Sequence, residues 1–403
     1  MQGGFLLSKM NRVGIGLIIV ASVLAGSVWA QSRPWWMGMS DAELSSDPFV
    51  GVTENGRIAE TGLDIDTSGI DVSRVTTTAT SFVGSLSDEQ RAKLLYGLQD
   101  VEWRRWSNID TYQRRGVKLA DMNDHQVDTA WALLNATLSS QGLKEVRSIM
   151  RLNLVEGELL GLTARMNEHE YYFTFMGIPS ADEPWGFQID GHHLALNITI
   201  NAGRITMTPA FFGSEPAVAP QGTTYAGETA LQAKQDAGLV FMRSLDDEQR
   251  RQAIIAPTKS GQDLVAGAFA DNAVIAYEGL RGDALVADQK KLLVELIRTY
   301  IGDIKRDAAD AWLTAVSAHL DDTWFAWIGG TDDNAVFYYR IYSPALLIEF
   351  DHQLPGPLGR HPDYRKSGAS REHIHSIVRT PNGGDYGDLL RQHLNEHHRQ
   401  TAK

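Results

Sequence analysis

Apolar positions along the chain follow two different spacings, and these spacings predict helices followed by strands in each half of the sequence. Apolar residues three or four positions apart are typical of a helix that buries one face, whereas alternation is typical of a half-buried strand. In the first half, helices are expected at 88–98, 125–139 and 143–160, and strands at 170–176, 186–200 and 204–212. In the second half, helices are expected at 228–242, 247–255, 288–304 and 306–320, strands at 323–328, 335–351 and 372–380, and a last helix at 386–398.

The second half also repeats phrases of the first half in the same order. FVGSLSDEQR at 82–91 returns as FMRSLDDEQR at 241–250, FTFMG at 173–177 as FAWIG at 325–329, and ITMTP at 205–209 as IVRTP at 377–381. The pattern predicts an internally duplicated α+β protein, in which repeats 82–213 and 227–399 each consist of helices and a three-stranded antiparallel meander. Because each meander alone is short, the two halves are expected to pack as one body, behind a linker or lead-in at 31–81.

The first thirty residues have the pattern of a secretory signal peptide. Lys9 and Arg12 precede an apolar run at 13–25, and the small residues of V-W-A at 28–30 occupy the positions that a signal peptidase requires. An uncleaved membrane anchor is the alternative, but about 13 apolar residues fall short of the roughly 20 that span a bilayer. Cleavage after residue 30 is expected to leave a periplasmic or secreted chain with no stable membrane insertion.

Charge and cysteine content narrow the possible chemistry. Lys and Arg together number 37 and Asp and Glu 50, a net charge of −13, so nucleic acid is not an expected partner. The chain has no cysteine, which excludes thiolate catalysis, iron–sulfur clusters and Cys-ligated zinc. Any metal ion must therefore be held by His, Asp and Glu. An acidic, exported chain without disulfides fits a bacterial envelope.

Histidines in the last expected strand form a candidate metal site. His373 and His375 are two residues apart, so both imidazoles lie on one face of the strand and can point at one ion. His193 and Glu349, on neighbouring strands, are expected to complete three or four ligands. A divalent ion in this set would be zinc for a hydrolytic reaction, whereas iron or copper would favour oxidation. The alternative is that the two histidines are ordinary surface residues of an exposed strand.

Four further residues are candidates for the chemistry around such an ion. Glu215 lies in a turn after the first meander, where a carboxylate can act as a general acid or base, as can Asp385 in the glycine-rich turn 381–387. Arg379 and Tyr386 are expected to stabilise developing negative charge. The structural alternatives are that Asp385 caps the helix that follows it and that Glu215 is a solvated turn residue.

Several of these phrases, taken in order, resemble the exported bacterial family catalogued as domain of unknown function 3500. The resemblance covers about residues 78–397 and rests on PWG at 184–186, GHHL at 191–194, GSEP at 213–216, YYRI at 338–341, EFD at 349–351, HIH at 373–375, RTPNG at 379–383 and DYG at 385–387. It implies one full-length domain behind a signal peptide. It implies no reaction, because no activity is assigned to the family.

The sequence leads to one main functional hypothesis and two alternatives. The main hypothesis is an exported envelope metalloenzyme, a metal-dependent hydrolase of a small polar or anionic substrate. The first alternative is a non-catalytic periplasmic binding protein in which Arg379, Arg340 and aromatic residues hold a small anion or sugar. The second alternative is an envelope assembly protein, for which a large exposed apolar patch would be the sign. The sequence leaves the substrate, the identity of the metal and the oligomeric state open.

Overall fold

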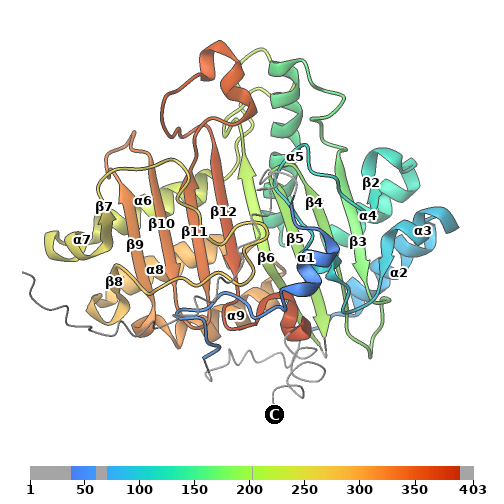
Figure 1. Cartoon of the computed structure of the whole chain (residues 1–403), viewed down its shortest axis with the longest axis horizontal. Helices are drawn as coiled ribbons and strands as arrows, with labels where there is room; N and C mark the ends of the chain where they lie inside the picture. Colours follow the sequence, from blue (N-terminus) through green and yellow to red (C-terminus); the bar gives the residue numbers. More distant parts are fainter. Residues whose placement is uncertain (1–37, 60–69, 202, 391–403) are drawn as a thin grey trace, which may run out of the picture. The chain divides into compact units, whose positions relative to one another are not determined.

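The computed structural model describes residues 38–59, 70–201 and 203–390, so the expected signal peptide and most of the expected last helix lie outside the described residues. The described chain is an α+β structure built on one mixed sheet, as the sequence predicts (Figure 1). The strands follow one another across the sheet in the order β1 (Leu95–Tyr96), β3 (Tyr171–Met176), β4 (Trp185–Gly191), β5 (Leu194–Asn201), β6 (Arg204–Ser214), β12 (Ile374–Arg379), β11 (Leu347–His352), β10 (Phe337–Tyr342), β9 (Trp324–Gly329) and β7 (Ile254–Ala256). Two short strands, β2 (Val117–Lys118) and β8 (Leu280–Arg281), pair with β3 and β9.

The two halves of the chain meet where β6 and β12 pair in the middle of the sheet. The pairing is antiparallel, with Ala210 opposite Val378 and Gly213 opposite His375. The neighbouring strands from β3 to β9 are antiparallel throughout, and only the short outer strands β1 and β7 are parallel to their partners. The halves therefore share one continuous sheet.

Each half contributes four antiparallel strands to this sheet rather than the expected three, because the long expected strands at 186–200 and 335–351 are both hairpins. The first is split into β4 and β5 by a tight turn at which His193 adopts a positive φ of 61°. The second is split into β10 and β11 by a turn in which the Ser343 hydroxyl accepts hydrogen bonds from the N–H groups of Ala345 and Leu346. At both turns the apolar positions change from odd to even numbers, a change of phase that the reading as one long strand does not account for.

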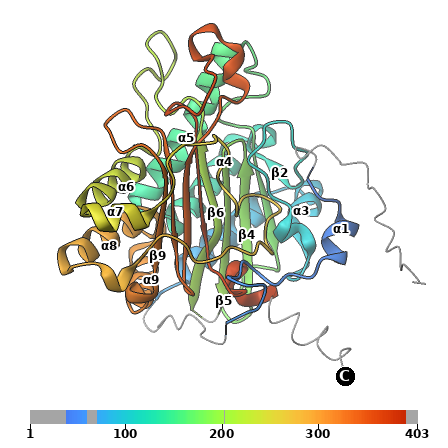
Figure 2. The same ribbon diagram turned by 60° about the vertical axis from the view of Figure 1, so that its left-hand side comes forward.

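Helices cover one face of the sheet and bury most of the apolar side chains against it (Figures 1 and 2). Within the described residues the helices are α1 (Asp41–Ser46), α2 (Ser73–Ser85), α3 (Asp88–Leu94), α4 (Asp124–Thr137), α5 (Ser140–Leu160), α6 (Gln232–Ser244), α7 (Asp247–Ala253), α8 (Ala287–Ile301) and α9 (Arg306–Ser317). The expected starts of α3 and α7 are confirmed, because Ser87 and Asp246 each form a capping box with the glutamine three residues later. None of the described helices is both long and apolar enough to cross a membrane.

The opposite face of the sheet is covered chiefly by segment 38–59, which includes the short helix α1, and by the irregular segment 257–279. Val52 and Ala266 from these segments are fully buried and pack in one cluster with Phe211, Leu347 and Ile377 of the sheet. The lead-in expected at 31–81 therefore has closely packed parts, and it also contains most of helix α2. This loop-covered face carries nearly all of the polar candidates from the sequence.

Candidate metal centre

Three histidines meet where the β4–β5 turn lies beside the start of β12. Gly213 of β6 lies between them: it pairs with His375, and its N–H donates a hydrogen bond to the carbonyl of His193 at 2.7 Å. A Cβ at position 213 would lie 3.0 Å from Cδ2 of His375 and 3.1 Å from Cδ2 of His193. Glycine at this position leaves room for the two imidazoles to approach each other across β6.

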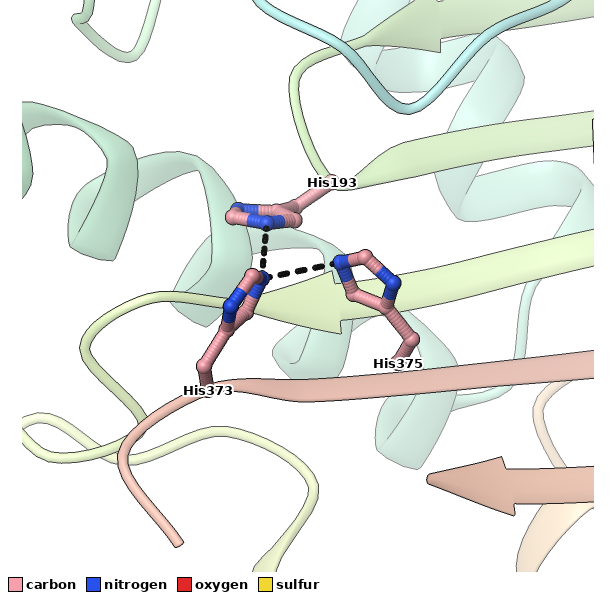
Figure 3. A group of neighbouring side chains, drawn as sticks. All are labelled: His193, His373 and His375. Carbon is pink, nitrogen blue, oxygen red and sulfur yellow. Dashed lines mark hydrogen bonds between the residues drawn. The ribbon is translucent and has the colours of Figure 1, made fainter. Parts of the chain in front are cut away.

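The three side chains, His193, His373 and His375, are called the histidine cluster, and they point at one another (Figure 3). Nε2 of His373 lies 3.2 Å from Nε2 of His193 and 2.9 Å from Nε2 of His375. In a tetrahedral zinc site with Zn–N bonds of about 2.0–2.1 Å, the ligand nitrogens are about 3.3 Å apart. The observed spacing is therefore close to that of a preformed metal site.

The protonation of the cluster also suits a metal ion. Nδ1 of His373 lies 2.6 Å from the carbonyl oxygen of Leu354, which can only accept, so Nδ1 carries a hydrogen and Nε2 is the ring nitrogen directed at the other two imidazoles. Burial lowers the pKa of His193 and of His375 well below the usual value for histidine, and the neighbouring imidazoles add to the effect. Neutral imidazole is the form that binds metals.

The cluster is largely buried, with His375 its least buried member. His193 is 3% exposed and His373 is 6% exposed, whereas His375 is only partly buried. The edge of the His375 ring meets the ring of Phe211, with centroids 5.1 Å apart. A metal held here would have three fixed nitrogen ligands and a side open to a further ligand, the arrangement of catalytic rather than structural zinc sites.

Glu215 lies next to the cluster, as the sequence predicts, but on the far side of the His373 ring. Its Oε1 is 3.7 Å from Nδ1 of His373, the nitrogen that points away from the other two imidazoles. The carboxylate is 2% exposed and accepts hydrogen bonds from the N–H groups of Gly356 at 2.8 Å and Leu358 at 3.1 Å. Glu215 is therefore not a solvated turn residue, and its position fits orientation of His373.

Glu349, expected as a fourth ligand, is not among the side chains that the fold brings together here. It is fully buried, and its oxygens accept hydrogen bonds from the Tyr338 hydroxyl at 2.6 Å and from the N–H groups of Val265 and Ala266 at 3.0 and 2.7 Å. Glu349 pairs with Ile377, two residues beyond His375 on β12. The carboxylate anchors the segment 257–279 to the sheet.

Arg379, Asp385 and Tyr386 also form a separate group, which together with Asp271 and Trp106 is called the arginine network. Nη1 of Arg379 donates to Asp271 at 2.9 Å and to Asp385 at 2.9 Å, while its other nitrogens donate to the carbonyls of Ala266 and Gly267. The Tyr386 hydroxyl donates to Asp271 at 3.2 Å and accepts from the Trp106 indole at 3.2 Å. The expected capping role of Asp385 takes another form, because its carboxylate accepts from the N–H of Thr380.

Two polar groups near the cluster were not expected from the sequence, Glu156 and Asn153 on helix α5. Together with His192 they lie on the helix side of the histidine turn, where Nδ1 of His192 is 2.9 Å from Oδ1 of Asn153. Ile149, Asn153 and Glu156 have helical spacing on the buried face of α5. The sequence feature that could have identified them is a polar residue on the otherwise apolar face of a helix.

Comparison with known proteins identifies a family without an activity. No curated protein and no solved structure matches the chain. The family described as "Protein of unknown function (DUF3500)" matches residues 68–388, a range that includes the histidine cluster and all strands of the sheet. The resemblance expected from the sequence is confirmed, and the chain belongs to this family.

Proposed function

We propose that this protein is a metal-dependent hydrolase of the bacterial envelope, exported by its signal peptide, and that His193, His373 and His375 hold the metal ion. The observation that carries the proposal is the convergence of three Nε2 atoms, 3.2 and 2.9 Å apart, in a buried position. Without an ion, Nε2 of His373 cannot bond both of its neighbours, because a ring nitrogen has one in-plane position, which holds either a hydrogen or a lone pair. A divalent cation accepts all three lone pairs at once.

The ligand set favours zinc among the candidate ions. Three imidazoles with a side open to solvent fit a zinc ion that lowers the pKa of a bound water. The same set can hold iron or copper, which would change the reaction to an oxidation. A small polar or anionic substrate fits the partly exposed side at His375. Glu215 acts as a positioning residue: with the carbonyl of Leu354, it keeps His373 in the orientation that directs Nε2 at the ion.

The alternative of non-catalytic anion binding through Arg379 has less support. Arg379 is fully buried, and four of its five N–H donors are used by protein oxygens. Arg340 is 5% exposed and donates to Glu278 at 2.7 Å. Neither guanidinium presents a free face to a ligand. Exposed large apolar side chains among the described residues are scattered, which gives the assembly alternative no support either.

We further propose that the two halves arose by duplication, with the metal site at their seam. Positions 152 residues apart are paired in the same way in the two halves: Phe173 with Ile189 and Phe325 with Ile341, and Gln188 with Asn197 and Arg340 with Glu349. At the seam, the hydroxyls of Thr208 and Thr380, which correspond in the repeated phrases, are 2.9 Å apart. In this interpretation one half supplies His193 and the other supplies His373 and His375.

Metal analysis of the purified mature protein tests the metal site. We expect at least one equivalent of zinc per chain after exhaustive dialysis, and loss of that equivalent in the His373→Ala, His375→Ala double variant. The His169→Ala variant is the matched control, because the His169 side chain is 57% exposed and pairs with Glu168, outside the cluster. Equal zinc binding in the double variant and the wild type would reject the site.

A separate assay tests the hydrolytic role. Wild-type protein should hydrolyse at least one member of a panel of carboxylic esters, phosphoesters and amides, and a chelator should abolish the activity until zinc is restored. The double variant should be inactive at every zinc concentration. A zinc-loaded protein that is inactive on the whole panel would leave the metal site standing and remove the hydrolase proposal.

A further inference from the structure

A second group of ligand-type atoms lies on the other side of the histidine turn, against helix α5. Asn153 and Glu156 are three residues apart on this helix, so their side chains point the same way. Nδ1 of His192 lies 2.9 Å from Oδ1 of Asn153 and 3.5 Å from Oε2 of Glu156. Nδ2 of Asn153 donates to the carbonyl of Asn167, which fixes the amide with Oδ1 toward His192. Because Oδ1 only accepts, Nδ1 of His192 carries a hydrogen when no ion is bound, and a cation between these atoms would displace that hydrogen.

Glu156 is the unusual member of this group. Its side chain is fully buried, no N–H or O–H donor of the described residues bonds its carboxylate oxygens, and its side-chain hydrogen-bond contact is with a second buried carboxyl group, Glu215. A buried carboxylate without a donor carries a desolvation cost that folded proteins seldom leave uncompensated. Two such carboxyl groups in contact can share a proton, or a cation can bind between them.

The neighbouring side chains do not supply positive charge. Glu215, through its charge and a side-chain hydrogen bond, and Asp110, through its charge, raise the pKa of Glu156 beyond the effect of burial itself. The charge of Arg165 lowers this pKa, but Arg165 is itself paired with Asp110 at 2.9 Å. The site is rich in acceptors and poor in positive charge.

We propose that Asn153, Glu156 and His192 hold a second divalent cation beside the three-histidine site. His192 and His193 are consecutive, and their rings stack with centroids 3.9 Å apart, so the two positions are neighbours. One ligand atom each of Glu156, His192 and His193 lies within 4.8 Å of the others. The mixed oxygen and nitrogen ligands suit manganese, iron or zinc. The inference goes beyond the proposed function and does not require it.

A pair of neighbouring cations would narrow the substrate class. Two-metal sites bind both the attacking and the leaving oxygen of a displacement, and they are common in hydrolases of phosphoesters and of peptides. A single three-histidine ion does not impose this preference. Two cations here would therefore favour a substrate with a negatively charged oxygen near the bond that is cleaved.

Metal stoichiometry of the full mature protein tests the second site. With zinc or manganese ions as the only probes, we expect two equivalents per chain in the wild type and one in the Glu156→Gln variant. The His373→Ala, His375→Ala variant should retain the equivalent that Glu156→Gln loses. Glu158→Gln, on the same helix but bonded to Thr224 instead, is the matched control and should bind two.

Each other result has a distinct meaning. One equivalent in both the wild type and Glu156→Gln would overturn the second site and leave the first intact, and Glu156 would then be a protonated acid, which glutamine mimics. No bound metal in any variant would overturn both sites. If Glu156→Gln does not fold, anomalous scattering from wild-type crystals soaked in zinc decides: a peak between Asn153 and Glu156 is expected, and a single peak at the histidine cluster alone would overturn the proposal.

Discussion

The histidine cluster and the arginine network lie on the same face of β12, and they differ in how their polar atoms are used. His375 and Arg379 are four residues apart, about 13 Å along the strand. In the arginine network, nearly every donor and acceptor of Arg379, Asp271 and Asp385 faces a protein partner. In the histidine cluster, three nitrogens face one another, and Glu156 nearby meets a second carboxyl group, Glu215, and no donor of the described residues.

This difference separates buried polar groups that stabilise the fold from buried polar groups that can bind a ligand. Both groups are buried and polar, and the sequence presents both as candidates for chemistry. A network in which charges and hydrogen bonds are satisfied holds the fold together and has nothing left to offer a ligand. A group of lone pairs that converge on one point lacks a positively charged partner, and a metal ion can supply it. Polar atoms without a protein partner are therefore a better guide to a ligand site than burial and polarity alone.

The largest expected effect comes from breaking the arginine network. Arg379→Gln leaves the carboxylates of Asp271 and Asp385 buried without their shared cation. Removal of one partner of a buried ion pair costs about 3–5 kcal/mol. Urea unfolding, monitored by tryptophan fluorescence, should show a loss of this size in the free energy of unfolding. A loss below about 1 kcal/mol would mean that the network is not the structural element that the contacts suggest.

Zinc should stabilise the protein through the histidine cluster and leave the arginine network uninvolved. At 100 to 1,000 times the dissociation constant, a ligand adds about 2.7–4 kcal/mol to the free energy of unfolding. Wild type should gain this increment from the cluster, and the His373→Ala, His375→Ala variant should keep only the gain that an ion bound at Glu156 gives. Tyr386→Phe should be less stable than wild type but gain the same increment. If Tyr386→Phe lost the increment as well, the two regions would be coupled.

A pH series gives a smaller effect that belongs to the network alone. Burial raises the pKa of Asp385 from 3.8 to about 6, with the ion pair to Arg379 offsetting part of the effect. The folded chain then binds the proton more tightly than the unfolded chain, so this contribution to stability is present at low pH and is lost as pH rises from about 4 to 6. In Asp385→Asn the contribution is absent at every pH.

Unfolding free energies between pH 4 and 7 provide the measurement. Relative to Asp385→Asn, wild type should lose about 1–3 kcal/mol over this range. The opposite sign, with wild type gaining stability on ionisation, would show that the ion pair with Arg379 outweighs the burial of Asp385. The zinc affinity of Asp385→Asn should equal that of wild type in either case.

The sequence predicted the strand of the histidines well because alternation fixes which side chains share a face. His375, Ile377 and Arg379 do lie on the same face of β12. Alternation does not predict which loop covers the side chains on that face. Asp271 and the N–H groups that bind Glu349 come from 257–279, a segment without periodicity, so the separation of Arg379 and Glu349 from the histidines depended on tertiary contacts.

The turn at His193 is a feature of the site that was not predicted from the sequence. The run 186–200 was expected to be one strand, yet the chain reverses between Gly191 and Leu194. This reversal places His193 at the end of a hairpin with φ of 61°, next to Gly213. The expected proximity of His193 to His375 is found in the structure. It depends on a turn that only the change of phase in the apolar positions indicates.

The smallest expected effect concerns Gly213, which separates two imidazoles of the cluster and touches nothing in the arginine network. In Gly213→Ala, the new Cβ would lie 3.0 Å from the carbonyl oxygen of Ile374, as well as close to both rings, so His193 and His375 must shift by a few tenths of an ångström. Metal sites tolerate only small changes in ligand position, and we expect a zinc affinity about 10-fold weaker, or about 1.4 kcal/mol.

Isothermal titration with zinc measures this change, with Gly84→Ala as the control. A Cβ at Gly84 in helix α2 meets no atom within 4 Å, so that variant should bind zinc as wild type does and be slightly more stable, by up to about 1 kcal/mol. Zinc affinity in Gly213→Ala within twofold of wild type would mean that the ion does not need the spacing between His193 and His375. One of these two imidazoles would then not be a ligand of the ion. The difference between the histidine cluster and the arginine network would then depend on His373 and one other histidine.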